Sequence, residues 1–174
     1  MSHERISLAD PPLSRLGHEA RYRLAAGYCD EGDIVVDAAC GTGYGADLIG
    51  GGTRVNYLGV ERDLSVIEVE RDYRGFLAAD LNTWRPDFPV DVAIVFETLE
   101  HLTDPAALVD WTYHVRKFLL VSVPIGPTLG ENPHHVRDYT PAEVRALWAG
   151  MCEVAYFEQP AERSGVWVFA PCQW

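Results

Sequence analysis

The chain has 174 residues, of which 48% are hydrophobic and 23% are charged, and its 14 basic and 26 acidic residues leave a formal net charge of −12. This length and composition predict one globular domain with a sizeable core and exclude a disordered chain. The acidic balance also argues against a nucleic acid as partner, because proteins hold a phosphate backbone through basic surfaces.

The sequence carries no pattern typical of secretion or membrane insertion. Residues 1–5 are polar and no apolar run follows them, and no segment approaches the roughly 20 apolar residues of a membrane helix. We therefore expect a soluble, cytoplasmic protein without a membrane partner. Because no two cysteines form a C-x-x-C pair, we expect reduced and mostly buried thiols. They are Cys29, Cys40, Cys152 and Cys172.

The first expected element is an amphipathic helix over residues 13–28. Its apolar residues recur every four positions, so we expect them to face the core. They are Leu16, Ala20, Leu24 and Tyr28. A short buried strand over 34–37 follows, and it runs into a glycine-rich loop at 40–45.

Strands and helices then alternate along the chain. Further strands are expected at 55–60, 76–79, 90–96 and 118–123, and the first three of these end at Glu61, Asp80 and Glu97. Helices are expected at 46–49, 64–70, 105–116 and after Thr140. The chain closes with a hairpin predicted from strands at 152–157 and 166–170.

This alternation predicts an α/β fold of the Rossmann-like, doubly wound type. We expect a mostly parallel, seven-stranded sheet with a C-terminal antiparallel hairpin and with helices on both faces. Ligands of such sheets bind at the carboxyl ends of the strands. The glycine loop and the three acidic residues that end strands are therefore predicted to share one edge of the sheet.

The chemistry of these strand ends fits a nucleoside. Glycines in the loop allow a ligand to approach the backbone at a helix N-terminus. Glu61 has the acceptor oxygens needed for two ribose hydroxyls, and Asp80 can accept from an adenine amine while Leu81 packs on the ring. Each feature alone is also typical of an ordinary loop; together they favour a binding site.

With their order along the chain, these segments resemble class I S-adenosylmethionine (SAM)-dependent methyltransferases, in particular the small methyltransferase-domain group. Residues 35–45 resemble the first motif of that family, 58–61 the second, 79–81 the third and 91–102 the fourth. The fourth contains Glu100-His101-Leu102, a string typical of this subgroup. The resemblance extends from about Leu16 to Leu147.

The resemblance implies SAM as cofactor and assigns the residues that bind it. Asp37 would order the glycine loop and reach toward the amino group of SAM, and Phe96 and Glu97 would lie on the sulfonium side. Tyr22 would either close over the cofactor or pack on the sheet. The expected cofactor-binding residues are Asp37, Ala39, Gly41, Gly43, Tyr22, Glu61, Arg62, Asp80, Leu81, Phe96 and Glu97.

We expect a single domain over 1–174 with four parts: an N-terminal helix and cap (1–30), a cofactor-binding core (31–124), a substrate-side loop (125–140), and a C-terminal helix and hairpin (141–174). Methyl transfer from a sulfonium needs alignment and, for a hydroxyl acceptor, removal of a proton. A histidine suits the second task.

Three histidines are candidates for that task. His101 either acts as the base or fixes its loop, and His134 and His135 lie in a segment that resembles a pocket-side motif of related methyltransferases. Because adjacent side chains point apart, we expect no metal site from the His134–His135 pair. Arg137 and Tyr139 are expected to contact the substrate.

Other functions remain open from sequence alone. A NAD-dependent oxidoreductase would fit the glycine spacing, but Asp37 interrupts the apolar run expected there and no substrate lobe is present. The Asp/Asn-Pro-Pro-aromatic motif of amino-methylating DNA enzymes is missing after the fourth strand. The helix after Glu61 is short, and such trimming is compatible with a protein of the same fold that binds a nucleoside without catalysis. We favour methyl transfer to oxygen of a small-molecule or glycan acceptor, by a monomer or homodimer.

Overall fold

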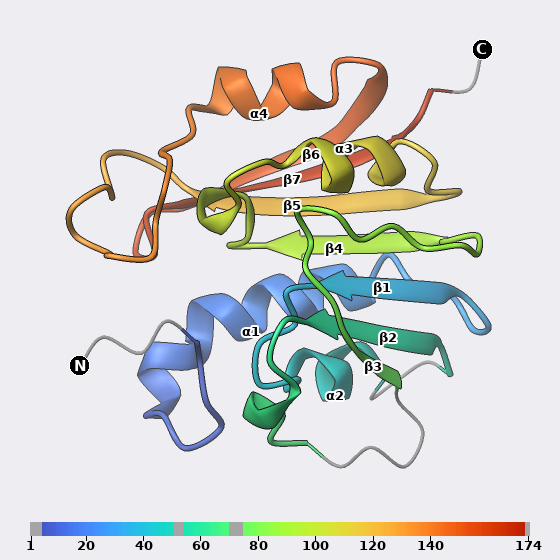
Figure 1. Ribbon diagram of the computed structural model, residues 1–174, viewed down its shortest axis with the longest axis horizontal. Coiled ribbons are helices and arrows are strands. Elements are labelled where there is room, and N and C mark those ends of the chain that lie inside the picture. Colours follow the sequence, from blue (N-terminus) through green and yellow to red (C-terminus); the bar gives the residue numbers. More distant parts are fainter. Residues whose placement is uncertain (1–4, 51–53, 70–74, 173–174) are drawn as a thin grey trace.

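The computed structural model describes residues 5–50, 54–69 and 75–172. Its centre is one seven-stranded sheet with the strand order β3-β2-β1-β4-β5-β7-β6 (Figure 1). The five strands β1, β2, β3, β4 and β5 run parallel to one another, whereas β7 is antiparallel to both β5 and β6. The strands are β1 (Ile34–Ala38), β2 (Asn56–Glu61), β3 (Gly75–Ala78), β4 (Val92–Phe96), β5 (Phe118–Pro124), β6 (Met151–Gln159) and β7 (Ser164–Pro171).

The helices cover both faces of the sheet, which confirms the predicted fold class. They are α1 (Pro12–Ala26), α2 (Gly45–Gly50), α3 (Ala106–Thr112) and α4 (Pro141–Leu147), with short 3-10 turns η1 (Leu64–Val66) and η2 (Leu99–His101). The helix expected over 64–70 is reduced to η1, and Glu70 lies outside the described residues. Within the described ranges, no helix has both the length and the apolar character needed to cross a membrane.

Alternate residues of each central strand enter two separate cores. In β1, Val35 packs with α1 and α2, whereas Val36 and Ala38 pack with α3 and α4. Figure 1 shows the same division, with α1 and α2 in its lower half and α3 and α4 in its upper half. Burial on both faces explains why the central strands read as continuous apolar runs rather than as alternating patterns.

The buried face of α1 differs from the expected one. Leu16 is 53% exposed, and the buried residues of the helix are Gly17, Arg21, Tyr22 and Ala25. A Cβ at position 17 would lie 2.2 Å from the Glu162 side chain, so a larger residue would have to displace that side chain. Leu24 and Tyr28 do pack against the core as expected, whereas Leu16 and Ala20 are exposed. The inner face also carries a glycine and an arginine, which hydrophobic periodicity does not detect.

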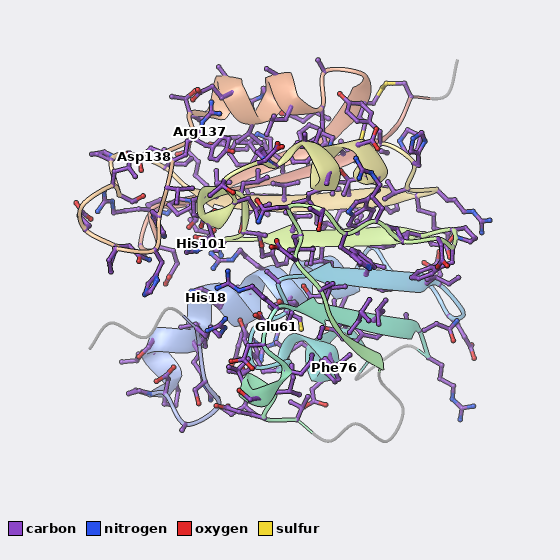
Figure 2. All side chains as sticks on the ribbon, in the orientation of Figure 1. His18, Glu61, Phe76, His101, Arg137 and Asp138 are labelled. Carbon is purple, nitrogen blue, oxygen red and sulfur yellow. A yellow bond between two sulfur atoms is a disulfide. The ribbon has the colours of Figure 1, made fainter. Side chains whose placement is uncertain are left out.

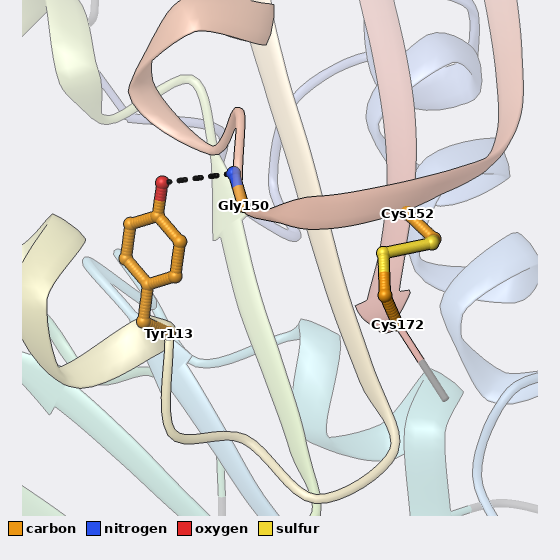
Figure 3. The surroundings of a disulfide bond; sticks show 4 residues. All are labelled: Tyr113, Gly150, Cys152 and Cys172. Carbon is orange, nitrogen blue, oxygen red and sulfur yellow. Dashed lines mark hydrogen bonds between the residues drawn. A yellow bond between two sulfur atoms is a disulfide. The ribbon is translucent and has the colours of Figure 1, made fainter. Parts of the chain in front are cut away.

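Two cysteines form a disulfide, so the expectation of four reduced thiols was wrong. Cys152 and Cys172 are bonded (Figure 3). In the β6–β7 hairpin Cys152 pairs with Ala170, which brings the two thiols together across antiparallel strands. Cys29 and Cys40 are free and buried, as expected.

Candidate functional site

A cavity of about 260 Å³ opens at the carboxyl ends of the parallel strands, near the point between β1 and β4 where the strand order reverses. This is where α/β sheets place ligands. Many predicted residues line it, namely Ala39, Gly41, Glu61, Arg62, Asp80, Leu81, Glu97, His101 and His134. Sequence reasoning missed further lining residues, namely Arg5, Ala79, Asn82, Thr98 and Leu102.

The loop after β1 has the backbone that its glycines predict. Gly41 and Gly43 have φ values of 58° and 84°, and Ala39 also has a positive φ of 61°. At Gly43 a Cβ would stand 3.0 Å from the side chains of Phe76 and Val69, so a larger residue would push the loop outward. Gly41 lines the cavity, whereas Gly43 is not among the lining residues.

Asp37 lies beneath this loop rather than on the cavity wall. It is 1% exposed and accepts hydrogen bonds from Tyr57 (2.6 Å) and Tyr22 (3.0 Å). Burial raises the pKa of Asp37 to about 7; the two tyrosine hydroxyls oppose the rise and the charge of Glu61 adds to it.

Tyr22 and Phe96, both expected to contact the cofactor, also lie in the core. Their rings meet edge to face at 5.3 Å, and Tyr22 contacts Tyr44 in the same way. A Cβ at Gly45 would stand 2.3 Å from the Tyr22 ring, so the first turn of α2 packs directly on it. In this structure the Tyr22 ring is buried and packs in the core.

Glu61 closes β2 with its carboxylate in the cavity wall. One oxygen accepts from the backbone of Gly41 (3.2 Å), and the other accepts from the backbone of Arg62 (2.9 Å). Arg5 also donates to Glu61 at 3.0 Å, although it lies 56 residues earlier in the chain. The segment before α1 therefore reaches the predicted ribose position, a contact for which the sequence carries no signal.

Asp80 and Leu81 follow β3 at the neighbouring strand end. The Asp80 carboxylate accepts from the backbone and side chain of Asn82, and these hydrogen bonds lower its pKa. Leu81 is 5% exposed but borders the cavity. A carboxylate that stays charged beside an apolar wall is the arrangement predicted for an adenine base.

Glu97 follows β4 in a conformation that costs energy. Its φ of 47° is unusual for a residue with a side chain. Ser122 donates to its carboxylate at 2.7 Å, Ser164 donates at 3.3 Å, and the buried Arg21 lies 3.8 Å away. These contacts aim a fixed negative charge at the cavity. Arg21 also donates to Gln159 at 2.8 Å.

His101 stands at the cavity wall in the turn η2. Its Nδ1 lies 3.2 Å from the carbonyl oxygen of His134, and its ring meets the ring of His135 edge to face at 4.8 Å. Behind it is Glu100, which is 1% exposed. Burial and the nearby charge of Glu97 raise the pKa of Glu100. Figure 2 shows His101 and Glu61 near the carboxyl ends of β4 and β2.

The residues predicted to contact the substrate in the loop between β5 and α4 do not all face the cavity. His134 lines the cavity, while His135 turns toward His101 and Thr128. Arg137 is exposed, pairs with Glu143 and lies over the ring of Tyr139, which is itself 3% exposed. Within the described residues, the cavity lining does not include His135, Arg137 or Tyr139.

Comparison with known proteins agrees with this geometry. Residues 2–147 match the family model described as methyltransferase domain. A probable SAM-dependent methyltransferase of Mycolicibacterium smegmatis is 35% identical over 156 residues, which cover 81% of this chain and 58% of the relative. The chain belongs to the class I SAM-dependent methyltransferase family. It spans little more than half the length of the curated relatives it matches.

Solved structures show the same methyltransferase fold. The N-methyltransferase NodS from Bradyrhizobium japonicum, in complex with S-adenosyl-L-homocysteine, has a TM-score of 0.75 at 15% identity, covering 95% of this chain and 91% of NodS. A putative methyltransferase in complex with the Haloferax volcanii Trm112 methyltransferase activator has a TM-score of 0.74 at 16% identity, covering 91% of this chain and 92% of that one. At these identities the likeness concerns the fold.

Proposed function

We propose that this chain binds SAM and transfers its methyl group to a hydroxyl of a small molecule or glycan. One observation carries the proposal: carboxylates at three successive strand ends, Glu61, Asp80 and Glu97, line one cavity together with Gly41 of the glycine loop. A ribose, an adenine amine and a cationic sulfonium each match one of these groups. The matched family supports the same cofactor.

In this proposal the acceptor enters beside His101. His101 lies on the cavity wall after β4, past the position assigned to the sulfonium, and its side chain is 24% exposed. Direct displacement needs the acceptor oxygen in line with the methyl group, so the protein acts mainly by alignment. The loop at 125–140 borders this region, because the Val136 amide donates to the Glu100 carbonyl oxygen at 2.8 Å.

Calorimetric titration of the purified chain with SAM, and separately with NADH, tests the cofactor. We expect SAM to bind and Glu61→Ala to raise its dissociation constant at least tenfold, because the ribose loses its acceptors. Glu158→Gln, an exposed change on β6, is the matched control and should leave affinity unchanged. Binding of NADH without SAM, or full SAM affinity in Glu61→Ala, would overturn the pocket assignment.

Methyl transfer requires a second experiment. Hydroxylated metabolites and oligosaccharides are incubated with radiolabelled SAM, and transfer is counted. With an acceptor in hand, His101→Ala should lower turnover more than SAM affinity, since the histidine lies at the acceptor end. Tight SAM binding without transfer to any acceptor would favour the non-catalytic nucleoside-binding module instead.

We further propose a cytoplasmic protein, monomeric or homodimeric, whose partner is neither membrane nor nucleic acid. The net charge of −12 supports the last point because it repels phosphate backbones. Disulfides are rare in a reducing cytoplasm, so the state of Cys152 and Cys172 in the cell, which are bonded in this structure, tests the proposed location. Rapid alkylation of cell lysates measures their state; a fully oxidised pair would contradict the proposed location.

A further inference from the structure

Three metal-ligating side chains meet beside the cavity. The candidate ligand atoms of Glu100, His101 and His135 all lie within 4.8 Å of one another. Two of these residues belong to η2 and the third comes from the loop before α4, so the fold alone brings them together. We propose that they form a binding site for a divalent transition-metal ion of the Zn²⁺ class.

Glu100 supplies the first argument. The residue is 1% exposed, and neither carboxylate oxygen accepts a hydrogen bond from another described residue. Burial of a carboxylate without such partners is costly, and buried acidic groups are usually paired or bound to a metal. The Nε2 atom of His101 is 3.9 Å from the Glu100 carboxylate. A cation between these groups would compensate the buried charge.

The hydrogen bonds of the two histidines supply the second argument. His101 Nδ1 faces the His134 carbonyl oxygen at 3.2 Å, and a carbonyl only accepts, so the proton of the neutral ring sits on Nδ1. The Thr128 hydroxyl donates to the Asp138 carboxylate at 2.7 Å and therefore accepts from His135 Nδ1, also at 2.7 Å.

Both rings are therefore held in the tautomer that carries its lone pair on Nε2. Metal-ligating histidines commonly donate the other ring N–H to a carbonyl or carboxylate, which fixes ring orientation and raises basicity. His101 donates its Nδ1–H to the His134 carbonyl oxygen. His135 donates its Nδ1–H to the Thr128 hydroxyl, which in turn donates to the Asp138 carboxylate.

The chemical types of the three ligands indicate which class of metal ion they would bind. Two imidazoles and one carboxylate are typical of catalytic zinc and of related first-row metals, whereas Mg²⁺ and Ca²⁺ prefer oxygen ligands. Ligands of a tetrahedral zinc ion lie about 3.4 Å apart, so binding requires small rotations that draw the cluster inward. Of the three residues only His101 borders the cavity, so the fourth coordination position is expected on that side.

The position of this metal site suggests a role for the ion in the proposed methyl transfer, and only that role rests on the proposed function. A metal at the acceptor end would lower the pKa of a coordinated hydroxyl and so prepare it for methylation. The presence of the site itself does not depend on methyl transfer. This site is not the His134–His135 pair, from which the sequence predicts no metal site. His134 is not one of the three ligands: its carbonyl oxygen faces His101, and the residue lines the cavity.

Metal titration tests the proposal. The full chain is stripped with EDTA and titrated with Co²⁺, read by visible d–d absorption, and with Zn²⁺, read by calorimetry; Mg²⁺ serves as a comparison. We expect one equivalent of Co²⁺ or Zn²⁺ per chain. His101→Ala, His135→Ala and Glu100→Gln should each weaken binding more than tenfold, and Thr128→Val about tenfold.

The matched control is His114→Ala, which removes an exposed histidine outside the cluster and should leave metal affinity unchanged. Circular dichroism confirms that each variant is folded, and Thr128→Val keeps all three ligands should a ligand variant fail to fold. Absence of uptake, or uptake that the cluster variants do not alter, overturns the site. SAM titration of the same stripped samples reports on the proposed cofactor separately.

Discussion

The hydroxyl of Tyr57 donates a 2.6 Å hydrogen bond to the buried carboxylate of Asp37, directly beneath the glycine loop. Tyr22 donates to the same carboxylate from α1, so a helix and a strand of the same core converge on one acidic group. These bonds do not fully offset the cost of burial, and the pKa of Asp37 remains raised to about 7. Asp37 therefore changes charge near neutral pH.

The free energy of unfolding should depend on pH because Asp37 ionises near neutral pH. A carboxyl group with a raised folded-state pKa contributes stability below its unfolded pKa, near 4, and loses that contribution as pH rises through about 7. We expect the free energy of unfolding of the wild type, relative to Asp37→Asn, to fall by a few kcal/mol between pH 4 and pH 8. Urea unfolding across this range measures it; a constant difference would contradict the raised pKa.

SAM affinity should change in the opposite direction with pH. The cofactor carries a sulfonium and an ammonium group, so the ionised form of Asp37 attracts it more strongly than the neutral form. We expect the association constant to rise between pH 6 and pH 8 with release of protons, measured by calorimetry in buffers of different ionisation enthalpy. The control Asp37→Asn should show a flatter profile. An equally steep rise in that variant would assign the effect to another group.

Arg21 should be important for stability although it lies on a surface helix. It is 1% exposed and 3.8 Å from Glu97, and its removal leaves the Glu97 carboxylate without this cation. We expect Arg21→Met to destabilise the fold by about 3–5 kcal/mol in urea unfolding, as for other broken buried ion pairs.

The matched control for this change lies two residues along the same helix. Arg23 pairs with Glu19 at the surface and its side chain is 58% exposed, so Arg23→Met should cost less than about 1 kcal/mol. Equal effects of the two substitutions would show that the buried charge pair contributes nothing beyond helix packing.

We predict that Arg5 competes with the proposed ribose for Glu61, because Arg5 donates to that carboxylate in this structure. The ion pair is 3.0 Å long and the Arg5 side chain is 30% exposed, which makes the interaction weak. We expect Arg5→Ala to tighten SAM binding roughly two- to fivefold, because the carboxylate no longer has to exchange partners. Arg54→Ala, an exposed change between α2 and β2, is the control. Weaker binding in Arg5→Ala would instead make Arg5 part of the cofactor pocket.

The Cys152–Cys172 disulfide should stabilise the C-terminal hairpin. It joins residues 20 positions apart, and closing a loop of that length restricts the unfolded chain by about 3 kcal/mol. We expect dithiothreitol to lower the urea midpoint of the wild type and to leave the Cys152→Ser/Cys172→Ser variant unchanged. A wild-type midpoint that does not respond to reductant would mean that the crosslink adds no stability.

Local chemistry explains why much of the fold and of the cavity lining was predictable. Each parallel strand is an apolar run bounded by turn residues, and the residue after such a run must lie at the ligand-binding edge of the sheet. Glu61, Asp80 and Glu97 are therefore placed correctly from their positions alone. The glycines at 41 and 43 likewise follow from the backbone conformation that this loop requires.

The tertiary structure alone decided which side chains from distant segments meet. The inner face of α1, the Arg5–Glu61 ion pair, the disulfide and the meeting of Glu100 and His101 with His135 all join residues that no local pattern connects. Burial then sets their chemistry, because a carboxylate such as Asp37 or Glu100 has its ordinary pKa in water and a raised one inside the fold. The sequence by itself determined the order of elements and the chemistry at the strand ends; packing between distant segments decided which of those groups are buried, paired or open to a ligand.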